Sequence, residues 1–245
     1  MASKIWAHRG ASGYAPENTL EAFRLAVEMK ADGVELDVHM SRDGELVVIH
    51  DETVDRTSNG KGRVVDLSLE ELKALDFSCG MEKYRGVKIP TLREVFELLK
   101  PTGFFINIEV KCDIVIYWGI WDKLIELERE SGMQGRILYS SFNHYVLMEI
   151  RKLDPGAKIG LLYSCAIVDP WVYAKYLNAN ALHPHYLALR APGMIEGCKK
   201  AGIELNTWTV NDPGAMKTLF EQNVNAVITN YPDKAVKIRD NMQLI

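Results

Sequence analysis

The chain has 245 residues, of which 47% are hydrophobic and 25% charged, as is typical of a globular protein. A net charge of -4 without a basic block argues against nucleic-acid binding, and no apolar run approaches the roughly 18 residues of a membrane span. Four widely spaced cysteines without a C-x-x-C pair indicate free thiols in a reducing compartment. The N-terminus lacks the apolar region of a signal peptide, so we expect a cytoplasmic protein without stable membrane insertion.

The first predicted β/α unit opens with a strand over residues 4–8, which ends in His8-Arg9-Gly10. A loop rich in glycine, serine and proline follows this strand. Asn18, with Glu21 three positions later, is predicted to be the N-cap of a helix that continues to about residue 30.

The second predicted strand, residues 33–39, contains two carboxylates among apolar residues, Glu35 and Asp37. Because side chains alternate along a strand, these carboxylates point the same way, about 7 Å apart. Two carboxylates on the inward face of a buried strand cost free energy unless they are neutralised, and a hard cation is the simplest partner. His39 lies on the same face near the end of the strand, where we predict a surface residue.

Asp43-Gly44 lies between two apolar runs, which is a strong signal for a β-hairpin. If these are the two turn residues, Asp37 faces His50 and Glu35 faces Glu52. The return strand would then bring His50 to the carboxylates. A parallel strand could not follow so short a connection.

The segment from residue 52 to about 90 is rich in glycine, serine and threonine, with one short helix that starts at Ser68. Strands and helices alternate regularly after it, beginning with a helix capped by Thr91. Without the return strand of the hairpin, eight strands are each followed by a helix. This pattern predicts an α/β protein with a closed (β/α)8 barrel, a TIM barrel. An open doubly wound sheet lacks support, because no glycine-rich nucleotide motif follows the first strand.

We therefore predict a single domain over residues 1–245, with a hairpin and small insertion subdomain at 39–90 after the second strand. In a TIM barrel the chemistry lies at the C-terminal ends of the strands. The residues at these ends are His8 and Arg9, Glu35 and Asp37, Glu109 and Lys111, Ser140 to Phe142, His183 and His185, and Trp208 and Asn211. One charged residue near a strand end usually belongs to a solvated loop, but so many ionisable groups on one rim have no evident structural purpose.

These groups suit chemistry on a phosphodiester. Glu35, Asp37 and Glu109 are oxygen donors, which favour Mg²⁺ or Ca²⁺ over Zn²⁺. A guanidinium and an ammonium beside them, from Arg9 and Lys111, could bind phosphate oxygens. Two histidines could exchange protons with the nucleophile and the leaving alkoxide near neutral pH, and His8 and His50 are the candidates.

The sequence resembles the glycerophosphodiester phosphodiesterases, of the bacterial cytosolic type. The matching segments run in order through nearly the whole chain: His8-Arg9-Gly10, Pro16-Glu17-Asn18-Thr19, Glu35-Leu36-Asp37-Val38, Asp43-Gly44, Ile49-His50-Asp51, Asn107-Ile108-Glu109-Val110-Lys111, Ser140-Ser141-Phe142, His183-Pro184 and Trp208-Thr209-Val210-Asn211. The resemblance implies hydrolysis of glycerophosphodiesters to sn-glycerol 3-phosphate and an alcohol. It also implies the acid–base role of the two histidines, one divalent cation on the three carboxylates, and phosphate contacts from the arginine and the lysine.

Two aromatic residues at strand ends have less specific interpretations. Trp208 could belong to the barrel core, but its place favours an apolar wall for the glycerol carbons. His183 and His185 have the H-x-H spacing of metallo-amidohydrolases, in which the motif lies on the first strand. We therefore predict His183 to be a rim wall or an indirect contact of the substrate.

The sequence leaves several alternatives open. The substrate could be a lysophospholipid, or the barrel could bind without catalysis. The nucleophile could be water or the glycerol 2-hydroxyl, and either histidine could be the acid. The metal, the alcohol and the oligomeric state, for which a homodimer is one candidate, are not determined.

Overall fold

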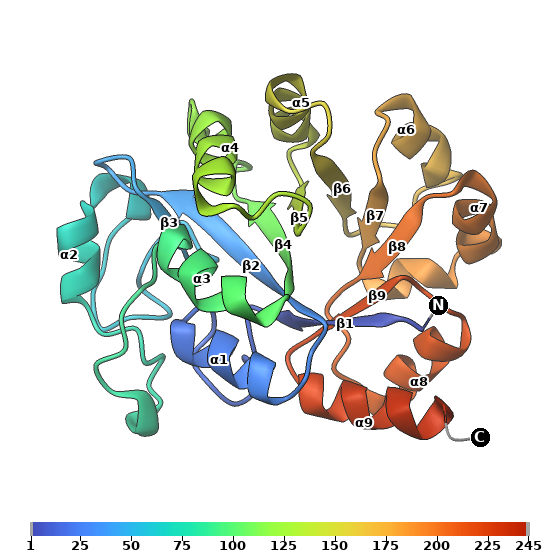
Figure 1. Cartoon of the computed structure of the whole chain (residues 1–245), viewed down its shortest axis with the longest axis horizontal. Helices are drawn as coiled ribbons and strands as arrows, with labels where there is room; N and C mark the ends of the chain where they lie inside the picture. Colours follow the sequence, from blue (N-terminus) through green and yellow to red (C-terminus); the bar gives the residue numbers. More distant parts are fainter. Residues whose placement is uncertain (1, 244–245) are drawn as a thin grey trace.

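The computed structural model describes residues 2–243, whose strands form one sheet that closes on itself (Figure 1). Strand β1 pairs in parallel with both β2 and β9, and the remaining neighbours follow in the order β9, β8, β7, β6, β5, β4 and β2. The strands are β1 (Lys4–His8), β2 (Gly33–Met40), β3 (Leu46–Val48), β4 (Phe105–Val110), β5 (Ile137–Ser141), β6 (Lys158–Tyr163), β7 (Ala181–Pro184), β8 (Glu204–Thr207) and β9 (Ala226–Thr229). The predicted TIM barrel is confirmed, with β3 as an antiparallel extension on β2.

Helices follow the barrel strands and cover the outside of the sheet (Figure 1). They are α1 (Leu20–Glu28), α2 (Leu69–Ala74), α3 (Leu92–Leu99), α4 (Ile120–Ser131), α5 (His144–Leu153), α6 (Pro170–Tyr176), α7 (Met194–Ala201), α8 (Pro213–Glu221) and α9 (Pro232–Gln243), with 3₁₀ turns at Val64–Asp66, Glu82–Tyr84, Lys100–Thr102 and Tyr186–Arg190. The large hydrophobic core lies between these helices and the outward faces of the strands. This layer accounts for most of the apolar burial that stabilises the fold.

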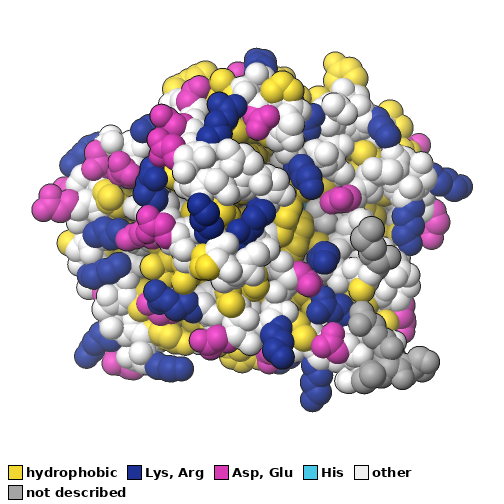
Figure 2. Space-filling model, in the orientation of Figure 1, with side chains coloured by type: hydrophobic (Ala, Val, Ile, Leu, Met, Phe, Trp, Pro, Cys, Tyr) yellow, Lys and Arg dark blue, Asp and Glu magenta, His cyan; other side chains and the backbone are white. Residues whose placement is uncertain are grey.

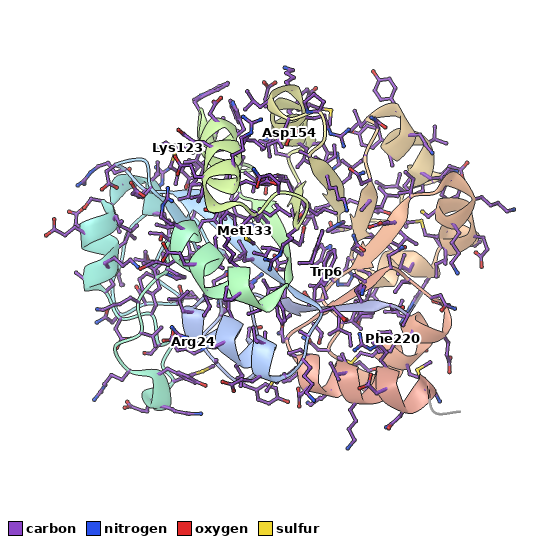
Figure 3. The ribbon with its side chains drawn as sticks, in the orientation of Figure 1. Trp6, Arg24, Lys123, Met133, Asp154 and Phe220 are labelled. Carbon is purple, nitrogen blue, oxygen red and sulfur yellow. The ribbon has the colours of Figure 1, made fainter. Side chains whose placement is uncertain are left out.

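The interior of the barrel contains a smaller apolar cluster around Trp6. Trp6 stacks on Phe105 with ring centroids 5.4 Å apart, Ala226 and Ile228 are buried beside it, and Trp208 packs against the cluster. Figure 3 shows Trp6 near the middle of the molecule, surrounded by the helices. The small cluster closes the barrel below its C-terminal rim.

The start of α1 differs from the prediction. Thr19 is the N-cap, because its hydroxyl accepts a hydrogen bond from the N–H of Ala22. Asn18 instead has a φ of 58° and donates a hydrogen bond from Nδ2 to Oδ2 of Asp37, 2.9 Å away. The predicted N-cap at Asn18 was therefore wrong, because a buried carboxylate takes its amide. The predicted capping boxes at Ser68 and Thr91 are confirmed.

The hairpin is confirmed, but its predicted register was wrong by one residue. Val38 lies opposite Val48, and the N–H of Ser41 donates to the carbonyl of Glu45 across a three-residue loop. Gly44, with a φ of 84°, ends this loop in the left-handed region, as in hairpins with a glycine bulge. The extra loop residue shifts every facing pair, so the N–H of Ile49 donates to the carbonyl of Asp37. His50 therefore lies beyond β3 and outside its ladder.

The segment between β3 and α3 packs around its own apolar cluster, beside the barrel. Figure 1 shows α2 projecting on one side of the molecule, beyond β3. The buried members of the cluster are Val47, Ile49, Val54, Val64, Leu72, Phe77 and Ile89. Because Val47 and Ile49 belong to or follow β3, the hairpin and the insertion share one small core.

The surface is mixed in charge. Figure 2 shows acidic and basic side chains interspersed on the face viewed. All four cysteines are free thiols. Within the described part of the chain, every helix is too short or too polar to span a lipid bilayer.

Candidate active site

Strands β2 and β4 bring together the three predicted metal ligands. Asp37 lies beside Glu109 in the parallel ladder, and Glu35 is two residues earlier on the same face of β2. One carboxylate oxygen from each lies within 4.8 Å of the others, and all three residues are buried. The structure therefore concentrates three acidic groups at one point near the C-terminal ends of the strands.

This proximity perturbs the ionisation of the carboxylates. Burial, together with the charge of Asp37, raises the pKa of Glu109 to about 7. Burial, with the charges of Asp37 and Glu109, raises the pKa of Glu35 well above its usual value. Burial also opposes ionisation of Asp37, but the positive charges of Arg9 and its other neighbours hold the pKa of Asp37 far below its usual range. One carboxylate is thus stabilised as an anion and two are destabilised.

The donor set fits a hard divalent cation. All three groups offer oxygen ligands, which Mg²⁺ and Ca²⁺ prefer. Oδ1 of Asp37 is fully buried and has no hydrogen-bond partner among residues 2–243. A buried unpaired carboxylate oxygen is costly, and a cation would neutralise it together with Glu35 and Glu109. The carboxylate cluster could therefore hold a metal ion.

Two cationic side chains flank the cluster. Nζ of Lys111 lies 2.7 Å from Oε1 of Glu109 and 4.0 Å from Oδ1 of Asp37. Nε of Arg9 lies 3.3 Å from Oδ2 of Asp37, and its Nη1 donates to Oε1 of Glu17. Arg9 has a φ of 56°, and its backbone N–H donates to Oε2 of Glu35 at 3.0 Å. The turn after β1 is therefore bonded directly to the carboxylate cluster.

His8 and His50 both line the cavity above the cluster, although they come from different elements. Nε2 of His8 is 3.9 Å from Oε2 of Glu35, and its Nδ1 is 2.6 Å from Oδ1 of Asn230. Burial and the charge of Arg9 lower the pKa of His8 to about 4. Nδ1 of His50 is 2.7 Å from Oδ1 of Asp51.

The cavity has a volume of about 120 Å³. Its lining consists of His8, Arg9, Glu35, His50, Asn107, Glu109, Phe142, Leu162, Trp208 and Ile228. Polar groups thus line one side, and Phe142 and Trp208 form an apolar side, with their rings 5.7 Å apart in an edge-to-face arrangement. This mixture suits a small ligand that has both an anionic and an apolar part.

Arg56, in the insertion, was not anticipated from the sequence. It donates hydrogen bonds of 2.7 to 2.9 Å to both oxygens of Asp51 and to both oxygens of Glu17. Arg56 thereby connects Asp51, which accepts a hydrogen bond from His50, to Glu17, which accepts one from Arg9. An arginine in a loop rich in polar residues carries no sequence signal of this role, because its partners are 5 and 39 positions away.

Two predicted positions lie deeper than expected. His39 is buried rather than a surface residue, and its ring contacts Tyr117 and the carbonyl of His50. The prediction was wrong because Tyr117, from the segment after β4, and the backbone of His50 pack against the ring. His183 is fully buried inside the barrel against Asn206, and it is absent from the cavity lining given above.

A closed barrel with buried ionisable groups around a cavity at the C-terminal ends of its strands defines the class of TIM-barrel enzymes. The sequence model of the glycerophosphoryl diester phosphodiesterase family matches residues 8–234. The chain belongs to this family, and the enzyme class predicted from the sequence, a glycerophosphodiester phosphodiesterase, is confirmed.

Individual relatives agree with this assignment. The chain is 48% identical to a glycerophosphodiester phosphodiesterase of Caldanaerobacter subterraneus, with 97% of this chain and 98% of the relative covered. It is 39% identical to a glycerophosphodiester phosphodiesterase of Bacillus altitudinis over 98% of this chain and all of the relative. Among solved structures, a phosphodiesterase of Oleispira antarctica in complex with the product sn-glycerol-3-phosphate matches with a TM-score of 0.87 and 32% identity, covering 98% of this chain and 97% of that chain.

Proposed function

We propose that the chain hydrolyses glycerophosphodiesters to sn-glycerol 3-phosphate and an alcohol in the cavity between His8 and His50, with one divalent cation on Glu35, Asp37 and Glu109. The observation that carries the proposal is a cavity of about 120 Å³ lined by both histidines, Arg9, Glu35 and Glu109. Asp37 completes the cluster of buried carboxylates behind this lining, and Lys111 contacts Glu109 and Asp37. The substrate class is supported by the names of the relatives and by the product bound to the Oleispira antarctica enzyme.

Mg²⁺ or Ca²⁺ bound to the three carboxylates would polarise a phosphate oxygen and neutralise charge that develops on it. Arg9 and Lys111 would bind the remaining phosphate oxygens, and both remain protonated because the adjacent carboxylates outweigh the effect of burial and raise the pKa of each. Their ion pairs with Glu17 and Glu109 hold them in place before the substrate arrives.

We assign the two histidines by their partners. Oδ1 of Asn230 accepts a hydrogen bond from Nδ1 of His8, which leaves Nε2 of a neutral ring free to accept a proton from the nucleophile. Asp51 accepts from Nδ1 of His50 and would stabilise the protonated ring, which suits it to donate to the leaving alkoxide. Hydrogen bonds from Arg56 keep Asp51 ionised, since they lower its pKa.

Trp208 and Phe142 would form the apolar wall against the carbon atoms of the substrate. His183 would not contact the substrate but would position Trp208, because the carbonyl of His183 accepts the hydrogen bond from Nε1 of Trp208 at 2.8 Å. The cytoplasmic location and the homodimer stay predictions.

The direct test is an assay of purified protein for glycerol 3-phosphate release from glycerophosphocholine, in Mg²⁺, in Ca²⁺ and in EDTA. We expect release that depends on the metal and an activity on lysophosphatidylcholine at least about tenfold lower. No release from any glycerophosphodiester with either metal would contradict the proposal, and preference for lysophosphatidylcholine would replace the substrate class.

A second experiment distinguishes the two nucleophiles. Hydrolysis in ¹⁸O-labelled water places the label in glycerol 3-phosphate by either route, so trapping of a cyclic glycerol phosphate is the deciding measurement. Its appearance during turnover would assign the attack to the glycerol 2-hydroxyl, and its absence together with failure of the enzyme to hydrolyse added cyclic phosphate would assign it to water.

A further inference from the structure

The buried ring of His39 joins three segments of the catalytic rim. His39 belongs to β2, and its Nε2 is 3.1 Å from the carbonyl oxygen of His50 while its Nδ1 is 2.9 Å from the hydroxyl of Tyr117. A carbonyl oxygen only accepts hydrogen bonds, so Nε2 carries the proton. Nδ1 of the neutral ring must then accept, and Tyr117 donates. Both nitrogens are satisfied, in a side chain that is 1% exposed.

The contact with the His50 carbonyl matters because His50 lies beyond the backbone hydrogen bonds of the hairpin. Strand β3 ends at Val48, and the last backbone bond of the hairpin is the one from the N–H of Ile49 to the carbonyl of Asp37. At the next residue, the connection between β2 and the backbone is made by a side chain: the His39 ring donates a hydrogen bond to the carbonyl of His50. Tyr117 comes from the segment after β4, the strand that carries Glu109.

From this arrangement we propose that His39 is a positioning residue for His50. A relay of two hydrogen bonds, from the Tyr117 hydroxyl to the His39 ring and from that ring to the His50 carbonyl, fixes the backbone of His50. The position of the backbone in turn sets how far the His50 ring extends into the cavity. The inference rests on the proposed acid–base function of His50. His39 does not line the cavity, so the proposal gives it no contact with substrate.

The chain contains a matched control for this relay. Nε2 of His144 is 3.0 Å from the carbonyl of Leu162, and its Nδ1 is 3.2 Å from the hydroxyl of Tyr173. The two rings therefore make the same pair of contacts, a tyrosine hydroxyl on Nδ1 and a backbone carbonyl on Nε2. They differ in burial, because His144 is half-buried whereas His39 is 1% exposed. They differ also in the residue on which they end: Leu162 lines the cavity with an apolar side chain, whereas His50 is a proposed catalytic histidine.

The test compares four variants: His39→Ala, His39→Gln, Tyr117→Phe and His144→Ala. For His39→Ala we expect kcat on glycerophosphocholine to fall by roughly tenfold to a hundredfold while KM stays within about twofold, because the reacting group is misplaced and the phosphate contacts remain. A glutamine amide can donate to the His50 carbonyl and accept from Tyr117, so His39→Gln should recover kcat to within about threefold of the wild type. Tyr117→Phe should lie between them, and His144→Ala should keep kcat within about twofold.

The proposal is overturned if folded His39→Ala retains the wild-type kcat, or if His39→Gln is as impaired as His39→Ala. It is also overturned if His144→Ala loses as much activity as His39→Ala. If His39→Ala does not fold, the glutamine variant and Tyr117→Phe still decide, because both keep the buried volume.

A measurement without turnover separates this inference from the proposed function. NMR of the histidine ring resonances should show a shift of the His50 signal in Tyr117→Phe and none in Tyr173→Phe. If the wild type hydrolyses no glycerophosphodiester but His50 shifts as stated, the function fails and the positioning stands; an unmoved His50 signal overturns the positioning.

Discussion

The catalytic rim has two halves that are built from different kinds of side chain. In the half formed by the ends of β1, β2 and β4, buried carboxylates lie against cationic side chains, as in the contacts of Asp37 with Arg9 and Lys111. In the half formed by the ends of β5 to β8, buried polar groups are neutral; burial lowers the pKa of His183 to about 3. Apart from Tyr14, the exposed large apolar side chains of the described residues lie between positions 114 and 187, in the part of the chain that begins after β4.

The difference shows that the free-energy cost of burying charged groups is concentrated in the half of the rim that contains the proposed metal site. A buried charge whose partner is removed is left uncompensated, so each substitution in the charged half disturbs several groups. In the neutral half a substitution removes packing or an exposed contact and leaves no charge behind. We therefore expect the largest effects of substitution in the charged half and the smallest in the apolar half.

The largest effect is expected for His8→Ala and His50→Ala. Each would remove a group that transfers a proton, so turnover of glycerophosphocholine should fall by roughly a thousandfold. The melting temperature should change little, because neither ring belongs to the large apolar core. Activity close to that of the wild type in either variant would contradict the assignment.

Removal of the cation comes next. Treatment with EDTA should abolish activity, and Glu35→Gln should raise the concentration of Mg²⁺ or Ca²⁺ needed for half-maximal rate by about tenfold or more, since one charged ligand is lost. Glu149→Gln, which changes a half-exposed carboxylate on α5, away from the cavity lining, is the control. Full activity in EDTA would exclude the metal assignment.

The pKa of Glu109 leads to a pH dependence of stability. Glutamate ionises near pH 4.5 in the unfolded chain, and at about pH 7 at this site without a cation. The stability that the protonated form contributes is complete below pH 4.5 and lost as the pH rises to about 7. A cation binds the ionised form, so the increase in Tm on adding Mg²⁺ should be larger at pH 8 than at pH 5.5. Calorimetry with Mg²⁺ or EDTA measures it, and an equal increase at both pH values would contradict the prediction.

A smaller effect is expected at the edge of the charged half. Arg56→Met would free Asp51 and Glu17 from their common partner, and kcat/KM should fall by about tenfold as His50 and Arg9 lose their orientation. Arg93→Met removes an exposed arginine that pairs with Glu130, and it should change neither activity nor stability appreciably. Equal behaviour of the two variants would show that the Arg56 network has no special role.

The smallest effect is expected in the apolar half. Tyr145 and Val168 are 85% and 89% exposed, so Tyr145→Ser and Val168→Ser should change the free energy of unfolding by no more than about 0.5 kcal/mol. Activity on glycerophosphocholine should stay within about twofold. A larger loss of activity would mean that this half contacts the alcohol, and would remove the contrast between the two halves.

Local rules of the chain were sufficient for much of the site. The alternation of side chains along a strand placed Glu35 and Asp37 on one face, and the periodic strands and helices predicted the closed barrel. The capping boxes at Ser68 and Thr91 were readable because all their partners lie within three residues. The resemblance of the motifs predicted the family.

Tertiary structure alone decided the features that depend on distant partners. The amide of Asn18 donates to the buried Asp37, 19 positions away, and Asn18 therefore does not cap the helix. His39 became a buried connection because the segment that carries Tyr117 covers it, and Arg56 joined Asp51 to Glu17 across 39 positions. Sequence patterns report the faces of single elements, whereas the burial of a side chain and the partner of a charge are set by elements that meet only when the barrel closes.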